Sequence, residues 1–250
     1  MVTSSPNLEV VAQEFWSGTR LESTFPRNLE HAVTLKLPLA CVKLPVLTVQ
    51  TVEQWLAGRQ LVLPLPLHHY DLLGCLVVQR GHGFIFVCSA DSADEQRFTL
   101  AHEVAHFLKD YLWPRQQVIA ALGGHITDVL DGARMATPAE RAAAILSRVR
   151  LGAHIHLLPR PGTDTDGVIA QTEARADQLA LELIAPRERI NSFLQNLPAR
   201  EAMHPQAVCA ALAAFFGLPA YAFDAIVRRR DERRPVSFLE DVRAALRRHQ

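Results

Sequence analysis

Residues 98–106 read FTLAHEVAH and form the centre of a helix that we expect to run from Glu95 to Leu108. From residue 98 to residue 108 every position is apolar except one threonine, two histidines and one glutamate. A helix that is apolar nearly all round is typical of a protein core. Ionisable side chains in such a helix cost free energy unless they have partners, so the histidines and the glutamate predict a functional site inside the core.

His102, Glu103 and His106 follow the HExxH pattern. Side chains four residues apart lie on the same face of a helix, so the two imidazoles can bind one metal ion. Glu103 lies about 100° around the helix from His102, beside the two histidines, where it can act as a general base on a water molecule. The pattern predicts His102 and His106 as metal ligands and Glu103 as the catalytic residue. A chance match is the alternative.

A catalytic zinc ion needs a third protein ligand and keeps a fourth position open. The downstream candidates for this ligand are Asp110, His125, Asp128, Asp131, His154, His156 and Glu173. Peptide hydrolysis also needs a hydrogen-bond donor for the oxyanion. The candidates for that donor are Tyr111, His125, His154, His156 and Tyr221, and the sequence leaves the choice among them open.

Glu173 is the preferred third ligand because Asp177 follows it by four residues on a helix expected over residues 171–184. One carboxylate can then bind the metal while the other accepts the second N–H of a ligating histidine, an arrangement that orients the ring. The alternative is that both are solvated charges paired with neighbouring arginines. His154 and His156 together are the rival ligands.

Two stretches resemble motifs of the ImmA/IrrE family of zinc metallo-endopeptidases, which are HExxH enzymes of the gluzincin type. Residues 98–106 resemble the family's FTLAHExxH signature, and residues 173–186, EARADQLALELIAP, resemble its ExxA(N/D)xFAxxLLMP motif. The resemblance implies that Glu173 is the third ligand of one catalytic Zn²⁺. Leu179 stands where the family motif has phenylalanine, an apolar exchange that only repacks a core. The gap before Glu173 is long for the family, so residues 112–170 are interpreted as containing an insertion.

We expect an α+β fold in which a small β-sheet packs on the active-site helices, followed by a helical, helix-turn-helix-like C-terminal module. Apolar runs at residues 72–78 and 84–88 flank a glycine-bearing loop, which predicts a hairpin. The expected helices besides the two that carry the motifs are residues 8–16, 51–56, 138–149, 205–216 and 219–229. The predicted organisation is an N-terminal segment (1–60), a peptidase domain (61–190) and a C-terminal segment (191–250).

The chain has 250 residues, no formal net charge and 49% hydrophobic residues, which argues against a disordered chain or a wholly basic nucleic-acid binder. The four cysteines match neither a zinc knuckle nor a disulfide framework. Without a visible export signal or an apolar run of membrane-spanning length, we expect a cytoplasmic protein with no membrane contact.

The resemblance implies an endopeptidase that makes limited cuts in a protein, a DNA-binding repressor, and so relieves repression under stress. Arginines cluster over residues 228–234, where they can contact nucleic acid or an acidic partner. One alternative is a DNA-binding regulator built on a peptidase fold. Another is an antitoxin-like protein that binds its partner without cutting it.

Overall fold

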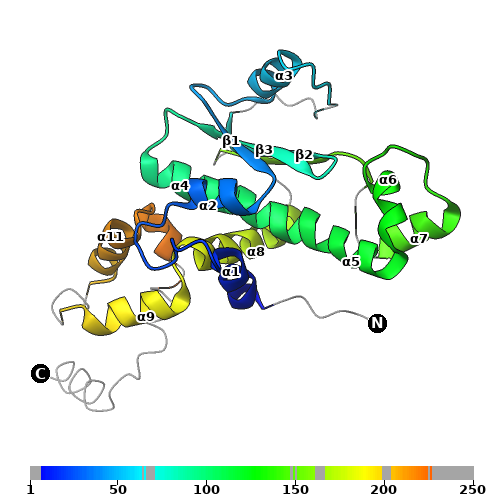
Figure 1. The fold of residues 1–250 in the computed structure, drawn as a ribbon. Helices are drawn as coiled ribbons and strands as arrows, with labels where there is room; N and C mark the ends of the chain where they lie inside the picture. Colours follow the sequence, from blue (N-terminus) through cyan, green and yellow to red (C-terminus); the bar gives the residue numbers. More distant parts are fainter. Residues whose placement is uncertain are drawn as a thin grey trace, which may run out of the picture.

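The structure of the chain is a computed structural model (Figure 1). It describes residues 7–63, 65, 71–146, 149, 151–160, 167–198, 204–224 and 226, with the backbone alone for 167–172. The strands are β1 (Leu39–Leu44), β2 (Leu72–Gln79), β3 (His82–Cys88) and β4 (His154–Pro159). The helices are α1 (Leu8–Trp16), α2 (Leu29–Lys36), α3 (Val49–Ala57), α4 (Ala93–His106), α5 (Trp113–Leu122), α6 (Thr127–Leu130), α7 (Pro138–Leu146), α8 (Gly167–Ile184), α9 (Arg187–Asn196) and α11 (Pro205–Phe216).

The four strands form one sheet in the order β1-β3-β2-β4. β2 and β3 are the predicted hairpin, and Arg80 and Gly81 connect them with positive φ angles of 52° and 83°. Two such residues form the turn that matches the twist of paired strands. β1 pairs with β3 in parallel and β4 pairs with β2 in antiparallel, so the strand at one edge comes from residues 154–159, in the stretch interpreted as containing an insertion.

The sheet separates two apolar clusters. On one face, Val52 and Leu56 of α3 pack with Val77 of β2. On the other face, Leu76 and Val78 of β2 pack with α4 and α8, as the alternation of side chains along a strand requires. Figure 1 shows α3 on one side of the sheet and α4 on the other. The predicted α+β class is confirmed.

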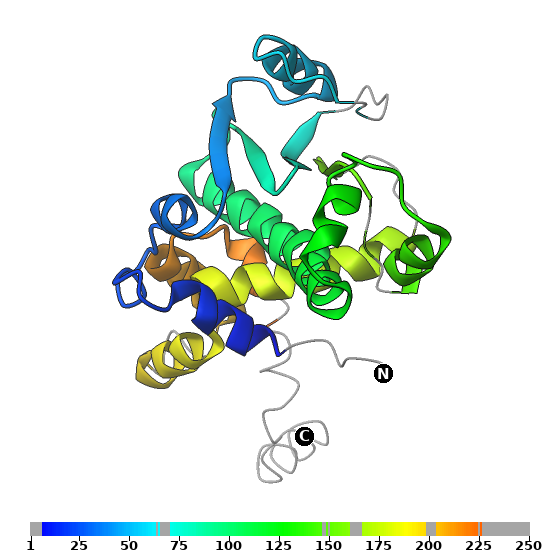
Figure 2. The same cartoon turned by 45° about the vertical axis from the view of Figure 1, so that its right-hand side comes forward.

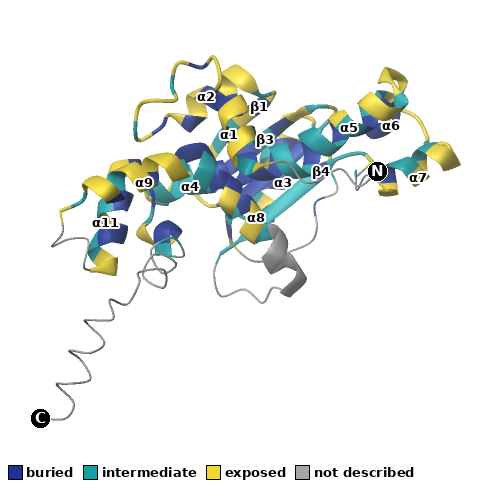
Figure 3. Cartoon of the chain, turned by 90° about the horizontal axis from the view of Figure 1, so that it is seen from below, coloured by how far each residue is buried: buried dark blue, intermediate teal, exposed yellow. Residues whose placement is uncertain are grey.

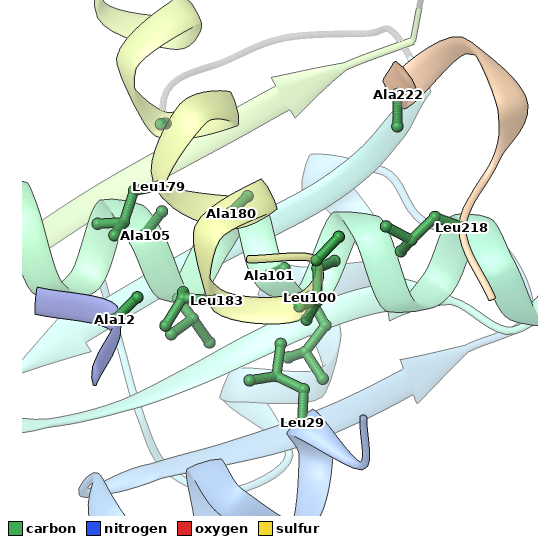
Figure 4. Packing of buried hydrophobic residues seen from close by; sticks show 14 of the residues in the cluster. Ala12, Leu29, Leu100, Ala101, Ala105, Leu179, Ala180, Leu183, Leu218 and Ala222 are labelled. Carbon is green, nitrogen blue, oxygen red and sulfur yellow. The ribbon is translucent and has the colours of Figure 1, made fainter. Parts of the chain in front are cut away.

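α4 lies between the sheet and α8 (Figure 2). Small side chains let the two helices approach closely: Ala101 and Ala105 of α4 pack with Leu179 and Ala180 of α8 (Figure 4). Figure 3 shows buried residues gathered where α4, α8 and the sheet meet. This packing brings the two sequence motifs together.

α4 begins two residues before the predicted start because Ser92 and Glu95 form a capping box. It also does not end at Leu108. A π-helical turn over Phe107–Leu112 continues it directly into α5, whose second residue is a proline. Since the helix is continuous here, this proline has no N–H to donate to the preceding turn, and the π-helical turn lies next to that break in the hydrogen-bond ladder.

The helix predicted over residues 205–216 is confirmed as α11, and Gly217 ends it with a φ of 64°. α11 belongs to the main core, since Leu212 and Phe216 are fully buried and Arg97 of α4 donates to the carbonyl of Gly217. The helix-turn-helix-like module is not confirmed: a 3₁₀ turn over Ala220–Phe223 follows α11.

The arginines at 228–234 lie outside the described residues, and the domain boundaries stay predictions. Among the described helices, none has the length and apolar character needed to cross a membrane.

Candidate metal centre

The HExxH residues lie on the part of α4 that is covered by both the sheet and α8. His102 and His106 are each 2% exposed and Glu103 is completely buried. Glu173 and Asp177 come from α8, which crosses α4 at this point. The helix packing therefore carries all five side chains to one place.

Four side chains direct donor atoms into one small region. His102, His106, His156 and Glu173 each place a donor atom within 4.8 Å of the others. The Nε2 atoms of His102 and His106 are 3.1 Å apart. Oε2 of Glu173 lies 2.9 Å from Nε2 of His102 and 3.3 Å from Nε2 of His106.

The other ring nitrogens of the two α4 histidines contact carboxylates. Nδ1 of His102 lies 2.8 Å from Oδ1 of Asp177, as the spacing of Glu173 and Asp177 predicts. Nδ1 of His106 lies 2.7 Å from Oδ2 of Asp110 in the π-helical turn. The sequence makes Asp110 a candidate ligand, but Asp110 contacts Nδ1 of His106, the ring nitrogen that faces away from the donor group.

His156 enters the site from β4. Its Nδ1 lies 2.9 Å from Oε2 of Glu103, and its Nε2 lies 3.4 Å from Oε1 of Glu173. Its ring stacks on His106 with centroids 3.6 Å apart and an interplanar angle of 19°. The sequence named His156 as a rival to Glu173, whereas the structure places both in the same donor group.

The two carboxylate oxygens of Glu103 differ in their contacts, and Oε2 is the one that is hydrogen-bonded to Nδ1 of His156. Within the described part of the chain, its buried Oε1 has no hydrogen-bond partner. Burial by itself raises the pKa of Glu103, but the charge and hydrogen bond of His156 outweigh it and lower that pKa. The side chain is thus a buried carboxylate that reaches the donor group through His156 and has an unpartnered oxygen, Oε1, next to Gly74 of β2.

The charges around the donor group favour a cation. Burial by itself lowers the pKa of His102, but the hydrogen bonds to Asp177 and Glu173 raise it to about 9. Burial likewise lowers the pKa of His156, but the carboxylates of Glu103 and Glu173 raise it to about 10. Four carboxylates contact three imidazoles here. Nitrogen and oxygen donors with excess negative charge fit a zinc ion.

The family comparison matches the part of the chain that contains the β2–β3 hairpin and α4, the helix that carries the HExxH residues. Residues 61–125 match the family model of the IrrE N-terminal-like domain, Peptidase_M78. This segment is similar to an IrrE N-terminal-like domain. The match confirms the family resemblance for these residues and supports a metallopeptidase. It ends before His156 and Glu173. No curated protein and no solved structure matches the chain.

The other sequence candidates lie outside the donor group. Asp131 is paired with Arg115 at 2.8 Å, and His125 is exposed. His154, on the same strand as His156, faces Tyr111, with ring centroids 5.9 Å apart. Tyr221 is 54% exposed.

Gly74 of β2, within the segment that matches the family model, leaves room for Glu103. A Cβ at this position would lie 2.7 Å from Oε1 of Glu103 and 2.7 Å from Cγ2 of Thr99. We expect Gly74→Ala to lower the free energy of unfolding by about 1–3 kcal/mol, the usual cost of overpacking a core, and to displace Glu103. Chemical denaturation measures the first effect.

Gly58→Ala is the matched control because a Cβ there meets only backbone oxygens at 3.5 Å or more. Its stability is expected to stay within about 1 kcal/mol of the parent protein. Equal stability of the two variants would contradict the close approach of β2 to Glu103.

Proposed function

We propose that the protein is a zinc-dependent endopeptidase that makes limited cuts in a DNA-binding transcriptional repressor in the cytoplasm. The observation that carries the proposal is the buried carboxylate of Glu103, with one oxygen available, beside the convergent donor atoms of His102, His106 and Glu173. A protein that only bound a partner would have no need for a base at this position.

His102, His106 and Glu173 would hold the metal. A zinc ion bound there acts as a Lewis acid and lowers the pKa of water. Glu103 accepts the proton of the attacking water on its carboxylate and passes it to the nitrogen of the leaving peptide. Because α8 and the sheet cover this part of α4, bulk water is kept from the buried carboxylate, and the proton stays with Glu103 between the two transfers.

Asp177 and Asp110 are positioning residues for the two α4 histidines. Each accepts the Nδ1 hydrogen and leaves the Nε2 lone pair directed into the donor group. We expect Asp177→Ala and Asp110→Ala each to weaken zinc binding roughly 10–100-fold, as measured by competition with a fluorescent chelator.

Asp94→Ala is the control for these two variants, since Asp94 lies on α4 with a half-exposed side chain and pairs with Arg97. It should bind zinc like the parent protein. An unchanged zinc affinity in Asp177→Ala would mean that this carboxylate is a surface charge without influence on the metal.

The repressor substrate is inferred from the family resemblance. Co-expression with a candidate repressor should produce two repressor fragments of defined mass with the parent protein and none with Glu103→Gln. A repressor that stays intact beside zinc-loaded parent protein would contradict the proposed substrate.

The C-terminal segment could recognise the repressor through its arginines, but α11 in the same segment supplies buried core residues such as Leu212 and Phe216. Deletion of residues 205–250 would therefore disturb the core, and it is no test of recognition. Contact of the arginines at 228–234 with DNA or an acidic surface stays a prediction. A steep dependence of DNA affinity on salt concentration would support it.

A further inference from the structure

The three histidines of the donor group share one arrangement. Each places Nδ1 on a carboxylate: His102 on Asp177 at 2.8 Å, His106 on Asp110 at 2.7 Å and His156 on Glu103 at 2.9 Å. Each also belongs to the group whose donor atoms lie within 4.8 Å of one another. His156 therefore repeats the geometry of the two histidines of the HExxH motif.

This geometry selects the tautomer that a metal ligand needs. A neutral imidazole carries one N–H, so donating it from Nδ1 to a carboxylate leaves the lone pair on Nε2. Carboxylates paired in this way with histidine are the usual support of a metal-ligating ring. In His156, the nitrogen left with the lone pair is the one that faces Glu173.

The fold holds His156 in this direction. β4 pairs with β2 in antiparallel, with His156 opposite Leu76. Successive side chains of a strand point to opposite faces, and Ile155 packs with the cluster on the α3 side of the sheet. His156 consequently faces α4, where its ring is stacked against His106.

We propose that His156 is a fourth protein ligand of the metal in the resting protein, and that a substrate has to displace it before cleavage. This inference rests on the proposed zinc site. Zinc sites with four protein ligands are closed, whereas catalytic sites keep one position for water or substrate. Three donors from α4 and α8 would leave that position open, and His156 fills it.

The arrangement restrains Glu103 at the same time. Oε2 of Glu103 is engaged by Nδ1 of His156, so the base also orients the fourth ligand. Displacement of His156 frees that carboxylate oxygen together with the fourth ligand position. One side chain thereby keeps the enzyme latent until a substrate occupies the site.

The test uses the full chain loaded with Co²⁺, whose visible absorption reports the number and kind of ligands, and acetohydroxamate as a probe for an open position. We expect acetohydroxamate to change the spectrum of the parent protein only weakly. His156→Ala should bind the probe at least about tenfold more tightly and bind zinc at least about tenfold more weakly, because a ligand has been lost.

Ile155→Ala is the matched control, because it removes a side chain from the same strand on the opposite face of the sheet. It should keep the metal affinity and the weak response to acetohydroxamate of the parent protein.

Two results would overturn the inference. One is a parent protein that binds acetohydroxamate as tightly as His156→Ala does. The other is an unchanged zinc affinity in His156→Ala. Either result leaves the proposed peptidase intact, whereas a parent protein that binds no zinc overturns both proposals. Where His156→Ala fails to fold, the Co²⁺-loaded parent protein decides the inference by itself: a weak spectral change on addition of acetohydroxamate supports it, and a full change to the spectrum of a probe-bound site overturns it.

Discussion

Replacing Glu103 by glutamine is expected to lower turnover by a factor of about 10²–10⁴, the usual contribution of a general base, while zinc stays bound. The amide has the shape of the carboxylate and its oxygen can still accept from Nδ1 of His156, so the site keeps its arrangement. It has no basic oxygen for the proton of the attacking water. Stopped assays of repressor cleavage, paired with zinc analysis, measure the two effects separately.

Glu14→Gln is the control for this exchange, because Glu14 is an exposed carboxylate on α1. It should cleave at the rate of the parent protein. Cleavage at the parent rate by zinc-loaded Glu103→Gln would contradict the assigned base, and loss of zinc from this variant would make Glu103 part of the metal site itself.

Removing the carboxylate of Glu173 is expected to weaken zinc binding more than about 100-fold. Removing a residue that only hydrogen-bonds to a metal ligand typically weakens binding about 10–100-fold. Oε2 of Glu173 is within 3.3 Å of both α4 histidines, so Glu173→Ala removes a donor from the centre of the group. His102→Ala should have an effect of the same size. Zinc titration by competition with a chelator provides the measurement.

His154→Ala is the comparison that separates the two third-ligand hypotheses. His154 lies on β4 near Tyr111, outside the donor group. The zinc affinity of His154→Ala should therefore stay near that of the parent protein. Full zinc occupancy in Glu173→Ala, combined with zinc loss in His154→Ala, would show that the third ligand was assigned to the wrong residue.

Several elements could be predicted from the sequence because their causes are local. The β2–β3 hairpin follows from two apolar runs around a loop that contains Gly81, which takes a positive φ at little cost. The end of α11 follows from Gly217, which takes the left-handed conformation at little cost. β4 could not be predicted from the sequence, because the segment 154–159 is short and takes its strand conformation from pairing with β2.

The HExxH spacing by itself determined that His102, Glu103 and His106 lie together, because the period of a helix places residues four apart on one face. The spacing of Glu173 and Asp177 indicated a ligand and its partner for the same reason. Only the tertiary structure decided which groups join them. α8 crosses α4 because small side chains allow close packing, and β4 takes the free edge of β2. These contacts join residues far apart in the chain, where no local periodicity relates one position to another. For that reason the roles of Asp110 and His156 could be read only from the folded protein.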